Sequence, residues 1–274
     1  MCKTEDNDAL DSLASKRVMM HFCAPATNAE SEIDRKLTGS AEQYDIPFEG
    51  QTLKVYGWGE GKTILLVHGW GSQASHMAFL GKNIAKSGFR VIAFDGPAHG
   101  KSEFNGSHPR SSMPEFSRAI FHLSNHFGPI YGMVGHSFGG AVATFTACGQ
   151  ANLSGYQVEV EKLVLISAPS GIEAMVNHYC RNYALPDGSK SAVIEQLERE
   201  FPLKVGDYEI NDALNKFAGE VLVVHDVGDP EVFIEEARQM VEGHRRVSLV
   251  ETRGEGHRKI LASRSLIKIV RSFL

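Results

Sequence analysis

One serine of this sequence stands in a setting suited to nucleophilic chemistry. Ser137 lies in the pattern Gly-x-Ser-x-Gly, with Gly135 before it and Gly139 after it. An apolar run, residues 131–136, precedes the serine, and a run rich in glycine and alanine, residues 138–149, follows it. A sharp turn between a strand and a helix lifts such a hydroxyl above a sheet, and the helix N-terminus favours developing negative charge. This setting predicts that Ser137 is the nucleophile of an acyl-transfer reaction.

A serine hydroxyl needs a base, and two later loops supply candidates for the base and for its acid. His257 lies in a glycine-containing loop just after a predicted strand, residues 245–251. Its rival His244 precedes that strand and would lie at the opposite edge of the sheet. Asp226 and Asp229 both follow the preceding predicted strand, and both remain candidates for the acid. We prefer Asp229, which stands just before the next helix, because Asp226 is better placed to brace the loop.

Acyl transfer also requires hydrogen-bond donors for the oxyanion of the tetrahedral intermediate. The backbone N–H of Phe138, directly after the nucleophile, is one expected donor. The other is the N–H of Trp70, in a glycine-containing loop after the predicted strand 63–68. The Trp70 ring either walls the acyl pocket or packs in the core. We expect His68 to hold this loop by a hydrogen bond and His99 to brace the turn after the next strand.

The elements that position these residues alternate between strands and helices from Thr63 onward. Short apolar runs are typical of strands buried on both faces, and runs with helical spacing separate them. The expected strands are residues 63–68, 89–95, 131–136, 161–168, 220–226 and 245–251, and the expected helices are residues 74–87, 114–127, 138–149, 232–241 and about the last fourteen. This alternation predicts an α/β fold with a mostly parallel central sheet and helices on both faces. The candidate residues follow the carboxyl ends of predicted strands, where ligands bind in such sheets.

At 274 residues the chain is long enough for one large domain. The alternation of predicted strands and helices is interrupted once. Residues 170–218 contain helical patterns and no buried strand. They predict a small helical cap between two core segments, residues 45–169 and 219–274. The aromatic residues of this cap, which either line an aromatic site or form the seam between its helices, are Tyr179, Tyr183, Phe201 and Tyr208. Tyr179, Tyr183 and Trp70 are candidate substrate-binding residues.

The first 44 residues are expected to form a helix and a polar segment that pack on the core. The spacing of Leu10, Leu13, Val18 and Met19 predicts an amphipathic helix over residues 8–21. This helix packs on its own core or on a second subunit, and the sequence does not fix the oligomeric state. After a polar stretch, residues 46–58 predict a hairpin that turns at Glu49 and Gly50.

The composition and charge argue against several classes of function. The net charge of −5 is spread along the chain, which argues against nucleic acid or an anionic membrane as a partner. No apolar stretch is long enough to span a membrane, and the acidic N-terminus is unlike a signal peptide, so we expect a cytoplasmic protein. The cysteines are scattered, which indicates reduced thiols. Of the histidines, only His122 and His126 stand four apart on a predicted helix, without an acidic residue between them. We expect no metal and no cofactor.

Five segments, in this order, resemble the α/β-hydrolase family of the bacterial, esterase-like kind: residues 68–71, 95–102, 135–140, 225–232 and 254–261. The resemblance runs from about Ile46 to the C-terminus. It implies the α/β-hydrolase fold, with Ser137, Asp229 and His257 as the catalytic triad. It also implies that Trp70 and Phe138 are the oxyanion donors. Epoxide hydrolases and haloalkane dehalogenases have Asp where this chain has Ser137, which excludes their usual chemistry.

The family does not name the substrate, because it also contains thioesterases, lipases, peptidases, perhydrolases and C–C bond hydrolases. We expect a serine hydrolase that cleaves a carboxylic ester or thioester of a small to medium molecule through an acyl-enzyme. A C–C bond or amide hydrolase on the same triad is one alternative. A non-catalytic binding protein on a hydrolase scaffold is another, because fold alone does not imply activity. A structural or interaction protein, docking through its leading helix, is the third.

Overall fold

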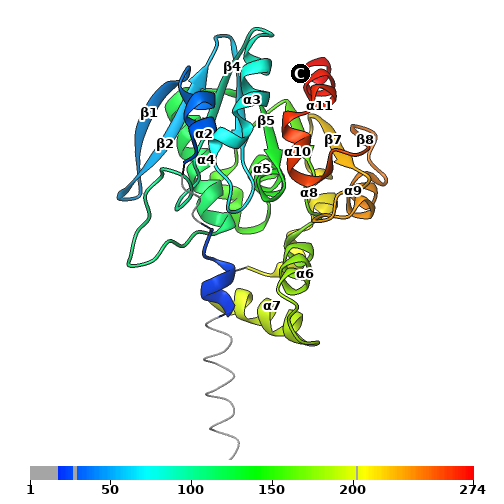
Figure 1. Ribbon diagram of the computed structural model, residues 1–274. Coiled ribbons are helices and arrows are strands. Elements are labelled where there is room, and N and C mark those ends of the chain that lie inside the picture. The colour runs from blue at the N-terminus through cyan, green and yellow to red at the C-terminus, as the bar shows by residue number, and fades with distance from the viewer. Residues whose placement is uncertain (1–17, 27–29, 202) are drawn as a thin grey trace, which may run out of the picture.

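The computed structural model describes residues 18–26, 30–201 and 203–274 (Figure 1). Eight strands form one sheet in the order β1-β2-β4-β3-β5-β6-β7-β8. Their bounds are β1 Glu42–Phe48, β2 Gln51–Trp58, β3 Lys62–Val67, β4 Phe89–Phe94, β5 Ile130–His136, β6 Lys162–Ile166, β7 Glu220–Asp226 and β8 Val247–Thr252. Strands β3 to β8 are parallel to one another, and β2 runs antiparallel to both of its neighbours. The predicted fold class, a mostly parallel sheet within an α/β fold, is confirmed.

Helices cover both faces of the sheet because the side chains of the buried strands alternate between two apolar faces. In β3, Leu65 and Val67 join a cluster with α4, α5, α8 and α9, whereas Ile64 and Leu66 join another with α3 and α11. The helices are α2 Glu32–Thr38, α3 Ala74–Ala85, α4 Met113–Phe127, α5 Phe138–Cys148, α6 Ile172–Asn182, α7 Ser189–Glu200, α8 Ile210–Leu214, α9 Ile234–Val241, α10 Gly256–Lys259 and α11 Arg264–Phe273. Short 3₁₀ turns are η1 Ala151–Tyr156, η2 Val205–Asp207 and η3 Ile260–Ala262.

The hairpin expected near the start of the core is present as β1 and β2. It turns at Glu49 and Gly50, whose φ angles are 47° and 79°. Positive φ at both positions suits the tight turn that matches the twist of two antiparallel strands. The first strand begins at Glu42, four residues before the predicted start at residue 46. The early start adds paired residues to the antiparallel edge, away from the candidate residues.

The polar stretch before the sheet contains a helix, α2, that its hydrophobic pattern does not predict. Ser31 caps this helix: its Oγ accepts a hydrogen bond from the N–H of Asp34, and the Asp34 carboxylate accepts one from the N–H of Ser31. The carboxylate also accepts a 2.7 Å hydrogen bond from Ser75 Oγ in α3, which ties the two helices together. A serine followed three residues later by an acid was the signal in the sequence.

Between β6 and β7 the chain forms α6, α7, η2 and α8, and Gly171 pairs with Glu209 in an isolated bridge. In Figure 1, α6 and α7 lie at one end of the molecule, beside the helical residues 18–22. Those residues are the described part of the helix predicted over residues 8–21. Its remaining positions, Leu10 and Leu13 among them, lie outside the described residues.

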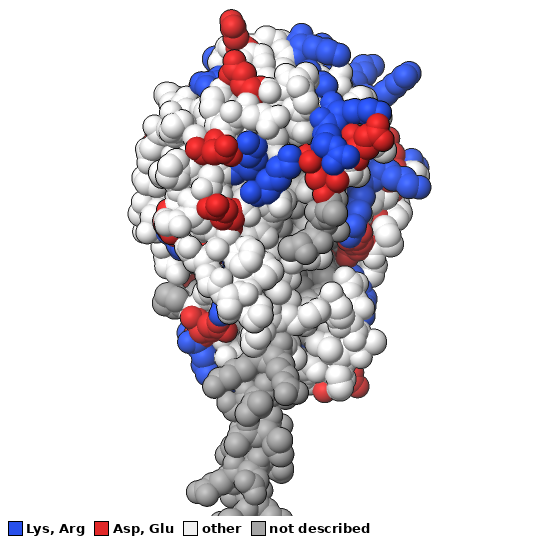
Figure 2. Space-filling view, turned by 60° about the vertical axis from the view of Figure 1, so that its left-hand side comes forward, with Lys and Arg blue, Asp and Glu red and all other residues white. Residues whose placement is uncertain are grey.

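The charged side chains of the surface are mixed in sign. Figure 2 shows basic and acidic groups side by side toward one end of the face it presents. Several of them pair, as Arg118 does with Glu49 at 2.7 Å and Lys36 with Glu32 at 2.7 Å. Exposed pairs of this kind add about 0–1 kcal/mol each to stability, so the fold depends mainly on its two apolar clusters.

Candidate active site

Ser137 occupies a strained turn between β5 and α5. Its φ and ψ are 54° and −128°, in a region that residues with a side chain rarely adopt. The turn is held because the N–H of Ser137 donates a 2.8 Å hydrogen bond to the carbonyl of Ile166 in β6. Its glycines allow strand and helix to approach closely: a Cβ on Gly135 would lie 2.4 Å from the Gly139 carbonyl oxygen. The half-buried side chain of Ser137 therefore sits at the N-terminus of α5.

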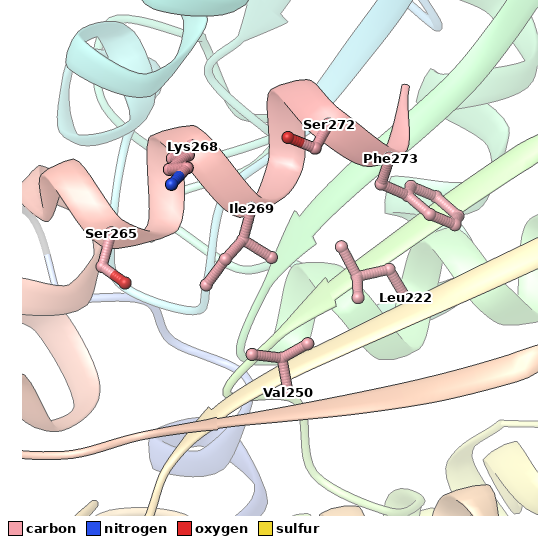
Figure 3. A pocket seen from close by; sticks show the side chains of 7 residues that line it. All are labelled: Leu222, Val250, Ser265, Lys268, Ile269, Ser272 and Phe273. Atoms are coloured by element: carbon pink, nitrogen blue, oxygen red, sulfur yellow. The ribbon is translucent and has the colours of Figure 1, made fainter.

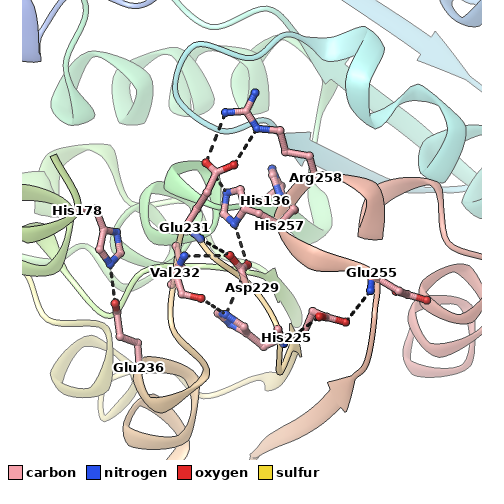
Figure 4. Close-up of polar contacts among 12 residues, drawn as sticks. His136, His178, His225, Asp229, Glu231, Val232, Glu236, Glu255, His257 and Arg258 are labelled. Carbon is pink, nitrogen blue, oxygen red and sulfur yellow. Dashed lines mark hydrogen bonds and ion pairs between the residues drawn. The ribbon is translucent and has the colours of Figure 1, made fainter. Parts of the chain in front are cut away.

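The structure brings Asp229 and His257 together in the buried loops after β7 and β8. Nδ1 of His257 donates a 2.8 Å hydrogen bond to Oδ2 of Asp229 (Figure 4). Because Nδ1 carries this proton, the neutral imidazole has a free lone pair on Nε2, as a general base requires. The other oxygen, Oδ1, accepts hydrogen bonds from the N–H groups of Glu231 and Val232, at 2.8 and 3.0 Å. Burial opposes ionisation, but these hydrogen bonds outweigh it and lower the pKa of Asp229 to about 2.

Asp226, the other candidate acid, holds the two loops in place. Its Oδ2 accepts hydrogen bonds from Thr252 Oγ1 at 2.9 Å and from the N–H of Glu255 at 3.0 Å. Its Oδ1 accepts a third from the N–H of Gly228, also at 3.0 Å. These bonds join the end of β7 to the end of β8 and to the residues just before His257. The geometry thus gives Asp226 the bracing position and Asp229 the position beside the imidazole.

Two buried histidines that the sequence analysis did not single out support this pair. His136, directly before Ser137, donates from Nε2 to the carbonyl of His257 at 2.8 Å. Burial and the neighbouring His257 lower the pKa of His136 to about 3, so it is neutral at physiological pH. His225 Nε2 donates to the carbonyl of Val232 at 2.9 Å and so fixes the loop of Asp229. Their signal in the sequence is a polar residue at the end of an otherwise apolar strand.

The Nε2 side of the buried imidazole lies near a second carboxylate. Nε2 of His257 lies 3.8 Å from Oε2 of Glu231, which Arg258 holds with hydrogen bonds of 3.0 and 3.4 Å. Figure 4 shows Asp229, Glu231 and His257 pointing toward one another. Among the described residues, no hydrogen bond joins Ser137 Oγ to Nε2 in this conformation. Catalytic hydrogen bonds often shorten only when substrate is bound.

The loop after β3 abuts the serine. A Cβ on Gly69 would lie 3.2 Å from the Cβ of Ser137, so any other residue there would crowd the serine. His68 holds the loop as predicted, since its Nε2 accepts from the N–H of Gly96 at 2.9 Å and its Nδ1 donates to the carbonyl of Gly69 at 2.7 Å. His99 braces the next turn through a 2.8 Å hydrogen bond between Nδ1 and the carbonyl of Pro97.

The two predicted oxyanion donors are neighbours. The rings of Trp70 and Phe138 lie edge to face, 5.1 Å between centroids, and Trp70 packs in the same way on His99 at 5.0 Å. The N–H of Phe138 belongs to the first turn of α5, where backbone N–H groups have no partner within the helix. The residues just before Trp70 and the start of α5 are in direct contact, since a Cβ on Gly139 would lie 2.5 Å from the His68 carbonyl oxygen.

The structure brings Tyr179 and Tyr183 to the N-terminal residues. Tyr179 hydrogen-bonds through its hydroxyl to Nδ1 of His21 at 2.9 Å, and Tyr183 packs edge to face on the His21 ring. Tyr208 is fully buried, and its hydroxyl donates to Asn152. Tyr179 and Tyr183 of the predicted cap thus contact the N-terminal residues, and Tyr208 packs in the core.

A groove of about 540 Å³ lies away from these residues, between α11 and strands β7 and β8 (Figure 3). Ile269 and Phe273 of α11 point across it toward Leu222 and Val250. Leu222 stands near the start of β7, whereas Asp229 follows its end. This groove is therefore separate from the candidate active site.

Metal-binding clusters and membrane-spanning helices are both absent from the described residues. Among residues 18–26, 30–201 and 203–274, no group of three or more His, Cys, Asp or Glu side chains is arranged to hold a metal ion. None of the helices in those ranges is long and apolar enough to cross a membrane.

Comparison with known proteins gives the family. The family model for the alpha/beta hydrolase fold matches residues 62–239, well over half of the chain. The chain therefore belongs to the α/β-hydrolase family. Membership of this family supports hydrolase activity.

Curated relatives match parts of the chain. The sn-1-specific diacylglycerol lipase ABHD11 of Danio rerio is 27% identical over 185 residues, 65% of this chain and 53% of that protein. Protein phosphatase methylesterase 1 of Rattus norvegicus is 31% identical over 118 residues, 40% of this chain and 30% of that protein. The chain thus spans about half of the first relative's length and less of the second's.

Solved structures share the fold over most of the chain. An esterase of Pyrococcus furiosus superimposes with a TM-score of 0.66 at 20% identity, covering 92% of this chain and 96% of that one. The thioesterase domain of the curacin biosynthetic pathway gives a TM-score of 0.61 at 18% identity, covering 85% and 98%. At such identities the likeness shows the fold alone.

Proposed function

We propose that this protein is a serine hydrolase that cleaves a carboxylic ester or thioester of a small to medium molecule. Ser137 is the proposed nucleophile, His257 the general base, and Asp229 the acid that orients it. The observation that carries the proposal is the buried 2.8 Å hydrogen bond from His257 Nδ1 to Asp229, on the loops that follow β7 and β8. That bond leaves Nε2 as the proton acceptor, at the strand ends where Ser137 also lies.

The proposed reaction has two steps. In the first, Ser137 Oγ bonds to the substrate carbonyl carbon while its proton moves to His257 Nε2. The tetrahedral intermediate then collapses: the bond to the leaving alcohol or thiol breaks, and Nε2–H protonates the leaving atom. In the second, His257 removes a proton from water, the resulting hydroxide attacks the acyl carbon, and Ser137 recovers its proton as the acid leaves.

The remaining parts of the site stabilise charge in these steps. The backbone N–H groups of Trp70 and Phe138 are the proposed donors to the oxyanion, where one such donor contributes about 3–4 kcal/mol to transition-state stabilisation. Asp229 stays ionised, in keeping with its pKa of about 2, and stabilises the imidazolium that forms on His257. The tight hydrogen bonding of both loops keeps these groups in position before substrate arrives.

We also propose a cytoplasmic protein whose partner is the small-molecule ester itself. The thiols of Cys23, Cys148 and Cys180 are free, which supports a reducing compartment. Fractionation of cells that produce the protein, with marker enzymes for each compartment, tests this location. Recovery with the membrane or secreted fraction would contradict it.

A fluorophosphonate probe tests the nucleophile before any substrate is known. We expect covalent labelling of Ser137, located by peptide mapping, and none in Ser137→Ala. The p-nitrophenyl ester of acetic acid should be hydrolysed by the wild-type protein only. Absence of labelling in the folded wild-type protein would favour a binding protein. A panel of esters, thioesters, amides and ring-cleavage diketones then identifies the bond that is cleaved.

A further inference from the structure

The N-terminal strap, which we define as residues 18–26, is fixed at one end to α6. The Tyr179 hydroxyl hydrogen-bonds to His21 Nδ1 at 2.9 Å and lies 3.5 Å from the carbonyl oxygen of Val18. The rings of Phe22 and Tyr179 meet edge to face at 5.0 Å, and His21 meets Tyr183 at 4.6 Å. Figure 1 shows the helical start of the strap beside α6 and α7. Helix α6 follows β6, so this end lies on the β6 side of the sheet.

The other end of the strap reaches the loops that follow β3 and β4. The carbonyl of Cys23 accepts a 3.0 Å hydrogen bond from the N–H of Ser111, between β4 and α4. A Cβ on Gly71 would lie 3.6 Å from the Cβ of Ala26, so Ala26 rests against the loop that contains Trp70. Cys23 is buried in the same apolar cluster as Phe138.

One attachment is on α6, which follows β6 in the chain, and the other is on the loops that follow β3 and β4. In the sheet, β5 stands between β3 and β6, and Ser137 directly follows β5. Residues 23–26 are not helical, and an extended stretch of four residues reaches roughly 13 Å. The strap therefore joins α6 to the loops on the β3 side of Ser137.

We propose that the N-terminal strap forms one wall of the substrate site and, with α6, sets the length of the acyl chain that the enzyme accepts. This inference rests on the proposed function. The strap precedes residues 62–239, the part of the chain that matches the family model.

The direction of the acyl chain follows from the position of the base. The leaving group must lie within reach of His257 Nε2, because that nitrogen protonates it. Asp229 and His257 follow β7 and β8, so the leaving group occupies the β6 to β8 side of Ser137. The acyl chain must then extend toward the opposite side, where Ala26 lies against Gly71.

In the experiment, the side chain at position 26 is enlarged by Ala26→Phe and, as a smaller change, by Ala26→Leu. Either substitution should narrow this side of the proposed site. Ala26 is exposed, so neither substitution crowds the core. The matched control is Ala192→Phe, which adds the same bulk to an exposed position of α7. The quantity measured is the ratio of kcat/KM for p-nitrophenyl decanoate to kcat/KM for p-nitrophenyl acetate. We expect the ratio to fall at least about fivefold in Ala26→Phe, less in Ala26→Leu, and to stay within about twofold in the control.

Fluorophosphonate labelling separates the two proposals. If Ser137 is labelled in every variant and the ratio falls only in the two Ala26 variants, the strap is a wall of the acyl site. If Ser137 is labelled but the ratio is the same in Ala26→Phe and the wild-type protein, the strap inference is overturned and the proposed function stands. If the folded wild-type protein is not labelled, the proposed function fails and the inference fails with it.

Discussion

The loops after β7 and β8 and the N-terminal strap both lie near Ser137, but they are held in different ways. In the loops, the buried carboxylates of Asp226 and Asp229 each accept three hydrogen bonds of 2.8 to 3.0 Å. Hydrogen bonds to a charged group contribute about 1.5–3 kcal/mol each. Met19 and Cys23 of the strap are buried in the core, but its contact with α6 is made by His21, which is exposed, against Tyr183, which is 56% exposed. Such exposed aromatic contacts contribute less, about 0.5–1.5 kcal/mol each.

This difference separates the part of the molecule that performs chemistry from the part that faces the substrate. A proton transfer loses efficiency when its groups move by about 1 Å, so the loops of Asp229 and His257 must be rigid. A wall of the substrate site needs only shape, and weak contacts are sufficient to hold it. We therefore expect changes in the loops to reduce rate strongly and changes in the strap to alter preference.

The largest effect is expected from Asp229→Asn. The amide keeps the size of the side chain but no longer stabilises the Nδ1–H tautomer of His257. We expect kcat for p-nitrophenyl acetate to fall by about 10³- to 10⁴-fold. Steady-state kinetics, with circular dichroism to confirm folding, measure this change.

Asp226→Asn is the matched control for that variant. Its carboxylate braces the loops, so we expect a loss of stability of about 2 kcal/mol and a fall in kcat at least tenfold smaller than in Asp229→Asn. Urea unfolding gives the stability. A greater fall in kcat for Asp226→Asn than for Asp229→Asn would reverse the assignment of the acid.

An intermediate effect is expected from His136→Phe. The phenyl ring retains much of the shape but loses the donor to the carbonyl of His257, which allows the imidazole to shift. We expect kcat to fall by about 10- to 100-fold with KM within about twofold of the wild-type value. His136→Gln, which keeps an N–H donor, should recover part of kcat. Equal kcat in His136→Phe and the wild-type protein would remove His136 from the positioning of the base.

The pH dependence of stability tests the same loops. The pKa of Asp229 in the folded protein is about 2, below its ordinary value of 3.8. A lowered pKa stabilises the fold above the unfolded value, and this contribution is lost as pH falls from about 4 toward 2. We expect roughly 2 kcal/mol to be lost in urea unfolding across that range, and less in Asp229→Asn. The same slope in both proteins would contradict this role of Asp229.

The smallest effect is expected from Tyr179→Phe in α6, at its contact with the strap. It removes one hydroxyl, hydrogen-bonded at 2.9 Å to the exposed His21. We expect about 0.5–1 kcal/mol of destabilisation, seen as a fall of a few degrees in Tm. A loss as large as that of Asp226→Asn would show that the strap is as firmly held as the loops.

The local parts of the fold were predictable from the sequence. Apolar runs located β3 to β8 within a few residues because strands buried on both faces must be apolar throughout. Helix α2 was not predicted from apolar periodicity because its only sequence pattern is a polar cap, Ser31 with Asp34. The turn at Ser137 was predictable because glycines on both sides allow strand and helix to approach.

Contacts between residues that lie far apart in the sequence were less predictable. The sequence favoured Asp229 over Asp226, but both remained candidates because they stand three residues apart after the same strand. His136 and His225 stand out in the sequence only as polar residues near the ends of apolar strands. Their partners, backbone carbonyls of distant or folded-back segments, were not predictable. The sequence likewise had no account of the first 44 residues beyond a helix packed on the core.

The sequence by itself determined the elements of this protein, the turn around Ser137, and the order serine, aspartate, histidine along the chain. These follow from local backbone preferences and apolar periodicity, which neighbouring residues encode. Only the tertiary structure decided that Asp229 meets His257, that His136 supports its backbone, and that residues 18–26 reach from α6 to the loop of Trp70. These depend on which strands are neighbours in the sheet, and sheet order arises from packing of the whole chain.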